Sequence, residues 1–245
     1  MVAKYSSKDC VFLIDGYNVL GVTTQIDHSV EAVTEEVTAL GDTWETHEYL
    51  GLRKAAFSQQ GFFDDASGSS NEALNNKQGN ERILCLGFEN NTIGKNFNGF
   101  QGAMQTNFER MASGGALHRA NAKYLGDGIT EDGKILHALT ARTANGNTES
   151  TPVDNAAQTT DGGSLYLQVS ALVLGGYTDV IIKVRQSDNG SAWEDLETFT
   201  AVTVAPAKER KIKAGIVKRY LAVSWAFTGT GNGPSITFFV GLVRN

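Results

Sequence analysis

Apolar and polar residues alternate in the C-terminal third of the chain. Val180, Ile182 and Val184 fall on one side of a strand, while Lys183 and Arg185 fall on the other. The same period of two recurs at two further sets of apolar positions: Leu221, Val223, Trp225 and Phe227, and then Ile236, Phe238, Val240 and Leu242. This period is typical of half-buried strands, and the glycine-containing stretches between them predict turns. We therefore predict an antiparallel β-sandwich over residues 164–245, of the jelly-roll or immunoglobulin-like type.

The N-terminal part is also β-rich, but its pattern is less regular. Two apolar runs flank Asp15-Gly16 within residues 10–24, and such a dipeptide favours the type I′ turn of a hairpin. Residues 25–65 are rich in Thr, Val and aromatic residues and carry Gly41 and Gly51. This composition favours extended strands with a loop over one long helix.

A polar segment follows and separates this region from a buried strand. Ser70, within the polar residues 66–80, is a candidate cap for a short helix, and the apolar residues 82–88 predict a strand. Residues 140–163 consist mainly of Thr, Ala, Asn, Gly, Asp and Gln, a composition typical of loops. We predict a mainly β protein with three parts: a domain over 1–145 with a flanking short helix, a linker over 146–163, and the C-terminal antiparallel β-sandwich.

Composition narrows the class of protein. The chain has 245 residues and a net charge of −6, which does not favour a nucleic-acid-binding surface. Its two cysteines, Cys10 and Cys85, lie in apolar runs and are predicted to be buried free thiols, although a disulfide between them is an open alternative. The first residues lack the pattern of a signal peptide, and no apolar run is long enough for a membrane helix.

Charge is distributed unevenly along the chain. No Lys or Arg occurs between Lys8 and Arg53, and that stretch holds nine acidic residues. Residues 198–245 instead hold seven basic residues and one acid, Glu209. Two solvated faces would explain this asymmetry; the alternative is a basic face that meets the acidic face of a neighbouring subunit, because opposite patches steer association and fix register. The candidate inter-subunit basic patch comprises Lys208, Arg210, Lys211, Lys213, Lys218 and Arg219.

The sequence contains no recognisable catalytic motif. The G-x-S-x-G, P-loop and H-E-x-x-H patterns are absent, and His28, His47, His118 and His137 are widely spaced. The glycines at 229, 231 and 233 lie between two predicted strands and indicate a hairpin loop rather than a phosphate loop. The acids at 127, 131 and 132 lack the spacing of an EF-hand, so a turn is preferred over a calcium site. We expect no enzymatic activity, no metal and no cofactor.

The N-terminal half resembles the major tail tube proteins of long-tailed, siphovirus-like bacteriophages. The resemblance is carried by the opening hairpin CVFLIDGYNVLGV, the Thr- and Glu-rich stretch from 30 to 65, and the polar segment before RILCLGF. It implies a β-sandwich or barrel-like sheet with a flanking helix, assembled into hexameric rings that stack into a tail tube. The implied partners are the chain itself, the tape measure protein and the tail terminator; DNA passes through without specific binding, and no membrane is involved.

The same resemblance implies a location and a lining for the tube. The protein would be made in the bacterial cytoplasm and incorporated in the tail of the virion. Acidic residues of the N-terminal stretch would face the lumen, where they repel DNA phosphates. The candidates are Glu31, Glu35, Glu36, Asp42, Glu45 and Glu48, of which about half can face one way on a strand.

The C-terminal part resembles β-sandwich modules of virion proteins and is similar to discoidin-type jelly rolls. The carriers are VRQSDNGSAWEDL at 184–196 and KRYLAVSW at 218–225. This similarity leaves alternatives open: a capsid decoration, connector or baseplate protein, or a carbohydrate-binding module that uses Trp193 or Trp225. As part of a tube subunit, the module is expected to lie on the exterior.

Overall fold

The computed structural model describes residues 10–41, 43–126 and 130–245. The N-terminal half contains β1 (Val11–Ile14), β2 (Tyr17–Asn18), the 3₁₀ turn η2 (Leu20–Val22), β3 (Thr23–Glu36), β4 (His47–Phe62), α1 (Ser70–Leu74), β5 (Glu81–Gly87), β6 (Asn96–Met111), β7 (Arg119–Gly126) and β8 (Thr130–Arg142). The C-terminal half contains β9 (Gly146–Asn147), β10 (Val153–Asp154), β11 (Gly163–Val173), β12 (Asp179–Ser187), β13 (Glu194–Thr198), β14 (Ala207–Lys213), β15 (Tyr220–Thr228) and β16 (Ser235–Arg244). The prediction of a mainly β, antiparallel fold is confirmed.

One large sheet runs through both halves of the chain. Its strands follow the order β14-β11-β16-β8-β6-β5-β1-β2, and β7 joins β6 to the β4–β3 hairpin. Strand β8 pairs with β6 at its start and with β16 along most of its length. The sheet therefore crosses the predicted boundary at residue 145, because a strand of the first predicted domain is hydrogen-bonded to the last strand of the second.

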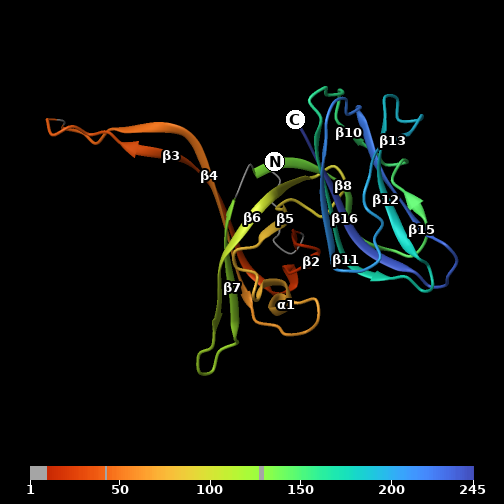
Figure 1. Ribbon diagram of the computed structural model, residues 1–245, viewed down its shortest axis with the longest axis horizontal. Helices are drawn as coiled ribbons and strands as arrows, with labels where there is room; N and C mark the ends of the chain where they lie inside the picture. The colour runs from red at the N-terminus through yellow and green to blue at the C-terminus, as the bar shows by residue number, and fades with distance from the viewer. Residues whose placement is uncertain (1–9, 42, 127–129) are drawn as a thin grey trace, which may run out of the picture.

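A smaller sheet covers one end of the large one (Figure 1). It contains β12, β13 and β15, with β9 and β10 paired to β15. These last two strands lie within the segment 146–163 that was predicted as a linker, so part of that polar segment is hydrogen-bonded to the sandwich. Its threonines contribute to this arrangement, since the Thr148 hydroxyl accepts a hydrogen bond from the Val223 amide at 2.9 Å.

The predicted alternation in the C-terminal strands is confirmed by burial. The residues Val180, Ile182, Val184, Leu221, Val223, Trp225, Phe227, Ile236, Phe238, Val240 and Leu242 form one core between the two sheets. Strand β16 is buried on its other face as well, where Phe239 and Val243 enter a second core with Phe97 and Tyr166. This second core packs the C-terminal strands against the N-terminal strands, which makes the two halves one body.

A third core lies under α1. It gathers Phe12, Ile14, Phe57, Phe100 and Tyr124 with neighbouring apolar residues, and the rings of Phe57 and Tyr124 are 5.5 Å apart. Strand β1 contributes alternate residues to this core and to the previous one. The opening apolar run is therefore buried on both faces, which explains why it shows no alternation.

The Asp15-Gly16 turn is confirmed, but the hairpin it closes is short. Both residues have positive φ, 51° and 89°, as a type I′ turn requires. Strand β2 spans two residues before the chain turns into η2. A Cβ on Gly16 would lie 2.7 Å from backbone atoms of Val169 and Ala207, so this turn packs directly against C-terminal strands.

The short helix is present, with a different residue at its start. Helix α1 spans Ser70–Leu74 and Ser69 is its N-cap residue. Ser70, the predicted cap, is the first helical residue; its hydroxyl donates to the Phe62 carbonyl at 3.0 Å. Ser69 precedes the helix because its backbone is extended and its carbonyl accepts the first helical hydrogen bond, from the Ala73 amide at 3.0 Å.

Candidate functional site

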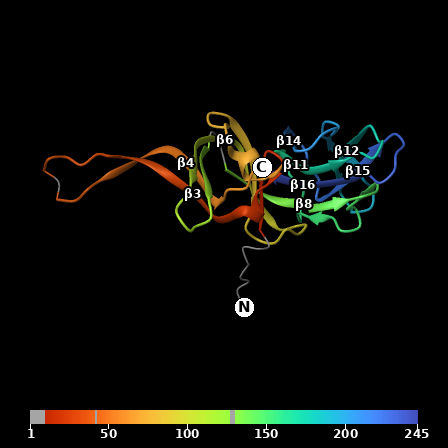
Figure 2. The ribbon, with the colours of Figure 1, turned by 90° about the horizontal axis from the view of Figure 1, so that it is seen from below.

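A two-stranded arm projects from the body of the molecule (Figures 1 and 2). Strand β3 pairs with β4 along its length, from Thr23 opposite Gly61 to Glu36 opposite His47. Strand β4 pairs with β7 only between Ala56 and Phe62. The arm, defined here as residues 30–54, therefore lies beyond the three-stranded part of the sheet, and the predicted extended strands over 25–65 are confirmed.

The arm exposes large apolar side chains. Trp44 is 83% exposed and Leu52 is 61% exposed. The exposed set on the arm comprises Val30, Val37, Leu40, Trp44, Tyr49, Leu50 and Leu52. A two-stranded ribbon has no sheet behind it to bury such residues and is marginally stable in water by itself. An exposed apolar surface of this kind marks an interaction site.

The predicted lumen-facing acids gather on this arm. Glu31, Glu35, Glu36, Glu45 and Glu48 are all exposed, and Asp42 lies outside the described residues. Glu35 and Glu48 are directly opposite one another, so they share a face of the ribbon, whereas Glu31 is opposite Lys54. Glu45 lies 3.1 Å from the ring of His47. The structure thus brings these acids together on a projection, and their role as a lumen lining stays a prediction.

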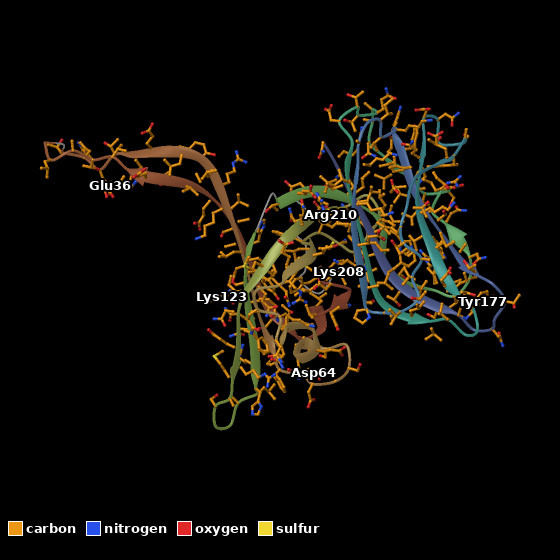
Figure 3. The ribbon with its side chains drawn as sticks, viewed as in Figure 1. Glu36, Asp64, Lys123, Tyr177, Lys208 and Arg210 are labelled. Carbon is orange, nitrogen blue, oxygen red and sulfur yellow. The ribbon has the colours of Figure 1, made fainter. Side chains whose placement is uncertain are left out.

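The predicted basic patch consists largely of residues that have acidic partners in the same chain. Lys208 and Arg210 lie near each other in the middle of the molecule (Figure 3). Lys208 pairs with Asp15, and Arg210 pairs with Glu131 at 2.7 Å. The remaining ion pairs are Lys211 with Glu197 and Glu209, Lys218 with Asp188 and Glu194, and Arg219 with Asp154. Five of the six basic residues therefore have compensated charge, and in the described chain Lys213 alone among the six lacks an acidic partner.

Two of these pairs belong to buried polar networks between the halves of the chain. Arg82 is almost fully buried and donates to Asp15, to Gln105 at 2.7 Å and to the Ala73 carbonyl at 2.8 Å. The Asp15 carboxylate also accepts from Lys208. The sequence analysis did not predict this network. In the sequence, Asp15 is typical of a turn and Arg82 is the polar first residue of an apolar strand, and nothing local indicates that the two side chains meet.

A second network surrounds Tyr166. Its hydroxyl donates to Glu131, and Arg210 bridges the same carboxylate and the Ser164 hydroxyl at 2.7 Å. Burial, followed by the hydrogen bond and charge of Glu131, raises the pKa of Tyr166 well above its usual value. These groups satisfy one another and do not present a reactive atom to solvent.

In the loop with acids at 127, 131 and 132, the described carboxylates bind other side chains of the protein. Its residues 127–129 lie outside the described part of the chain, Glu131 binds Arg210, and Asp132 accepts from Asn98. Among the described residues, no group of three or more His, Cys, Asp or Glu is arranged to hold a metal ion. The glycines at 229, 231 and 233 lie in a loop between β15 and β16, but these strands belong to different sheets, so the loop connects the two sheets and the predicted hairpin is wrong.

The cysteines and tryptophans complete the predicted candidates. Cys10 and Cys85 are not bonded to each other; Cys85 is buried, as predicted, and Cys10 is only half-buried because it lies at the start of the sheet. Burial raises the pKa of the Cys85 thiol to about 12.

Trp225 is a core residue whose indole N–H donates to the Ala144 carbonyl at 2.7 Å, so it is not available to a sugar. Trp193 is half-buried and lies immediately before β13. In the described chain, no helix has the length and apolarity needed to cross a membrane.

The chain is similar to a few solved structures of phage-like particles, although its sequence matches no known family. No protein-family model matches the chain, and no curated protein sequence matches it. One similar solved structure is the virion of a native gene transfer agent particle, with 19% identity, a TM-score of 0.38, and coverage of 53% of this chain and 98% of that chain. A second is the tail of an empty gene transfer agent particle, refined with C6 symmetry, with 17% identity, a TM-score of 0.38, and coverage of 52% and 97%.

A third similarity extends over nearly the whole chain. It is to the SPP1 Dit (gp 19.1) protein, described as a hub adsorption apparatus protein of phages that infect Gram-positive bacteria. The identity is 11%, the TM-score 0.31, and the coverage 96% of this chain and 99% of that chain. TM-scores of this size do not establish a shared fold.

Proposed function

We propose that this chain is a structural, non-enzymatic subunit of a phage-type tail, and that it assembles with copies of itself into stacked rings that form a tube. The observation that carries the proposal is the arm, which leaves apolar residues such as Leu40 and Trp44 in solvent. Burial of such residues stabilises an assembly by about 25 cal/mol for each Å² of apolar surface removed from water. Among the described residues of the isolated chain, no surface covers them.

The free strand edges support self-assembly. Among the described strands, β3 pairs with β4 alone and β14 pairs with β11 alone, so each leaves one edge of the large sheet open. Free edges promote pairing with another chain unless they are protected. The lysines and arginine of β14 are protective, whereas the 14-residue β3 has no Lys or Arg. Contacts at the β3 edge between copies would remove an open edge, as closure of a barrel does.

The resemblance of the N-terminal sequence to tail tube proteins gives the assembly its biological setting. In that setting the tape measure protein, the tail terminator and passing DNA are the other components. The acids of the arm then lie where copies meet or where DNA passes, and those that face the DNA repel its phosphates.

Negative-stain electron microscopy at rising protein concentration tests the proposal. The wild-type chain is expected to form rings or uniform tubes with a central channel. A matched variant replaces residues 33–52 with Asn-Gly, because Ala32 and Arg53 are directly opposite in the ribbon and a two-residue turn can join them. This variant is expected to remain folded and monomeric. Particles that form equally well without the arm would contradict the proposed role of the arm, and a wild-type chain that stays monomeric would contradict self-assembly.

A further inference from the structure

We propose that the arm of one copy docks on the outer face of the β6–β7 hairpin of a second copy, defined by Met104, Met111, Arg119, Lys123 and Leu125. The inference rests on the proposed function and names the receiving surface. Strand β7 alternates strictly: Ala120, Ala122 and Tyr124 are buried, and Arg119, Lys123 and Leu125 are exposed. The buried side belongs to the core under α1, and the exposed side is covered by no element of the described chain.

Register places the five residues on a single face. Met104 is directly opposite Leu125, and Met111 is directly opposite Arg119, so each pair projects to the same side of the sheet. Met104, Met111 and Leu125 are all exposed large apolar residues. A shallow hollow lies beside Lys123 and Leu125, and Asp27, His28 and Ser58 are among the other residues that line it. The face thus offers apolar contacts together with a hollow that a side chain can enter.

Two cations on this face have no ion-pair partner among the described residues. Neither Arg119 nor Lys123 forms an ion pair, and Arg119 lies over the ring of Phe62 at 5.7 Å. Two carboxylates lie on the same face, Glu109 opposite Asn121 and Asp27 in the lining of the hollow, but neither is paired with Arg119 or Lys123. This differs from the C-terminal basic cluster, in which five of six residues have acidic partners. Lys123 projects from the body on the side from which the arm leaves (Figure 3). The face therefore favours an acidic, apolar partner.

The arm has the complementary character. Glu35 and Glu48 lie directly opposite one another on the ribbon, and like charges in that position are destabilising. A cation from another molecule would relieve the repulsion. Apolar residues, among them Tyr49 and Leu50, adjoin this pair of carboxylates. Acidic and apolar groups on the arm thus match basic and apolar groups on the β6–β7 face.

The second copy is the occupant because the arm and the β6–β7 hairpin of one chain diverge from the body in different directions (Figure 1). Donor and acceptor are different surfaces, which makes the contact heterologous. Heterologous contacts generate closed rings or open filaments according to the rotation between copies. The same pairing of surfaces can therefore build a ring or link successive rings.

Compensating charge reversal tests the pairing. The double variant Lys123→Glu/Arg119→Glu is expected to raise the concentration at half-assembly by about tenfold or more, measured by sedimentation velocity, because charges across an interface then repel. The arm variant Glu35→Lys/Glu48→Lys is expected to be impaired similarly. Combining the four substitutions in one chain is expected to restore most of the association.

The control variant is Lys213→Glu, since Lys213 also lacks an acidic partner and lies on β14, away from this face. It is expected to assemble like the wild type, and circular dichroism melts confirm that all variants fold. Unchanged assembly of Lys123→Glu/Arg119→Glu, or no restoration in the combined chain, overturns the acceptor assignment. In either case, if the shortened-arm variant still fails to assemble, the proposed function stands. A wild-type chain that never associates overturns both.

Discussion

Arg210 donates to the Glu131 carboxylate at 2.7 Å, and this ion pair joins β14 to the start of β8 across 79 residues of sequence. The two side chains are only 10% and 13% exposed. We expect Glu131→Ala to lower the free energy of unfolding by about 3 kcal/mol, because removing one partner leaves a buried charge unpaired. Chemical denaturation measures the loss. The matched variant Asp154→Ala breaks a pair whose side chains are each 43% exposed, and it should cost much less; equal losses would contradict the importance of burial.

His137 should make the protein sensitive to acid. Burial, assisted by the charge of Arg142, lowers the pKa of His137 from 6.5 to about 4. The unfolded chain therefore binds a proton at higher pH than the folded chain. The free energy of unfolding should fall by about 3 kcal/mol as pH decreases from about 6.5 to about 4, with no further contribution from this residue below that.

His137→Gln isolates this contribution. The ring nitrogen Nε2 accepts from Arg142 at 3.0 Å, and a glutamine oxygen can accept the same bond without titrating. Stability of both proteins is measured by urea denaturation at several pH values. The wild type should lose more stability than the variant between pH 6.5 and 4; parallel curves would show that His137 does not titrate on unfolding.

Gly99 should not tolerate even one added methyl group. A Cβ at this position would lie 2.6 Å from the ring of Tyr166, which is held in place by Glu131 and Arg210. Gly99→Ala is expected to destabilise the protein by about 1–3 kcal/mol through overpacking. Thermal unfolding provides the measurement. Gly114→Ala is the control, because nothing lies within 4 Å of a Cβ there, and it should melt close to the wild type.

Trp44 should report assembly directly. The side chain is 83% exposed on the arm, so acrylamide should quench its fluorescence efficiently in dilute protein. Burial against a second copy should protect it and shift its emission to shorter wavelength as concentration rises. The difference between wild type and Trp44→Phe isolates this signal from Trp193 and Trp225. An accessibility that stays constant while particles form would place Trp44 outside the contact.

In the C-terminal sandwich, the local pattern of apolar residues was sufficient to predict which side chains are buried. Val180, Ile182 and Val184 were predicted on one face from their spacing alone, and all three are fully buried. A period of two determines the inward face of a strand whatever its neighbours are. The Asp15-Gly16 turn was likewise predictable, because positive φ at both positions is a local requirement that this dipeptide satisfies.

Ion pairs between segments distant in the sequence were determined only by the tertiary structure. The sequence shows a cluster of basic residues near the C-terminus, but not that Arg210 is bound to Glu131 or Lys208 to Asp15. Strand pairing brought those carboxylates to the cluster and so removed most of its free charge. Conversely, Lys123 stands out in no sequence pattern, and only the tertiary structure shows that it is exposed and forms no ion pair among the described residues.

The sequence by itself determined that the chain is mainly β, which faces of the C-terminal strands are apolar, and where acidic and basic residues concentrate. These properties depend on local spacing and composition. The tertiary structure decided that the two halves share one sheet, that the acidic stretch becomes a projecting arm, and that its apolar residues stay in solvent. Each of these outcomes depends on hydrogen bonds and contacts between segments far apart in the chain, such as β8 with β16, which no local pattern encodes.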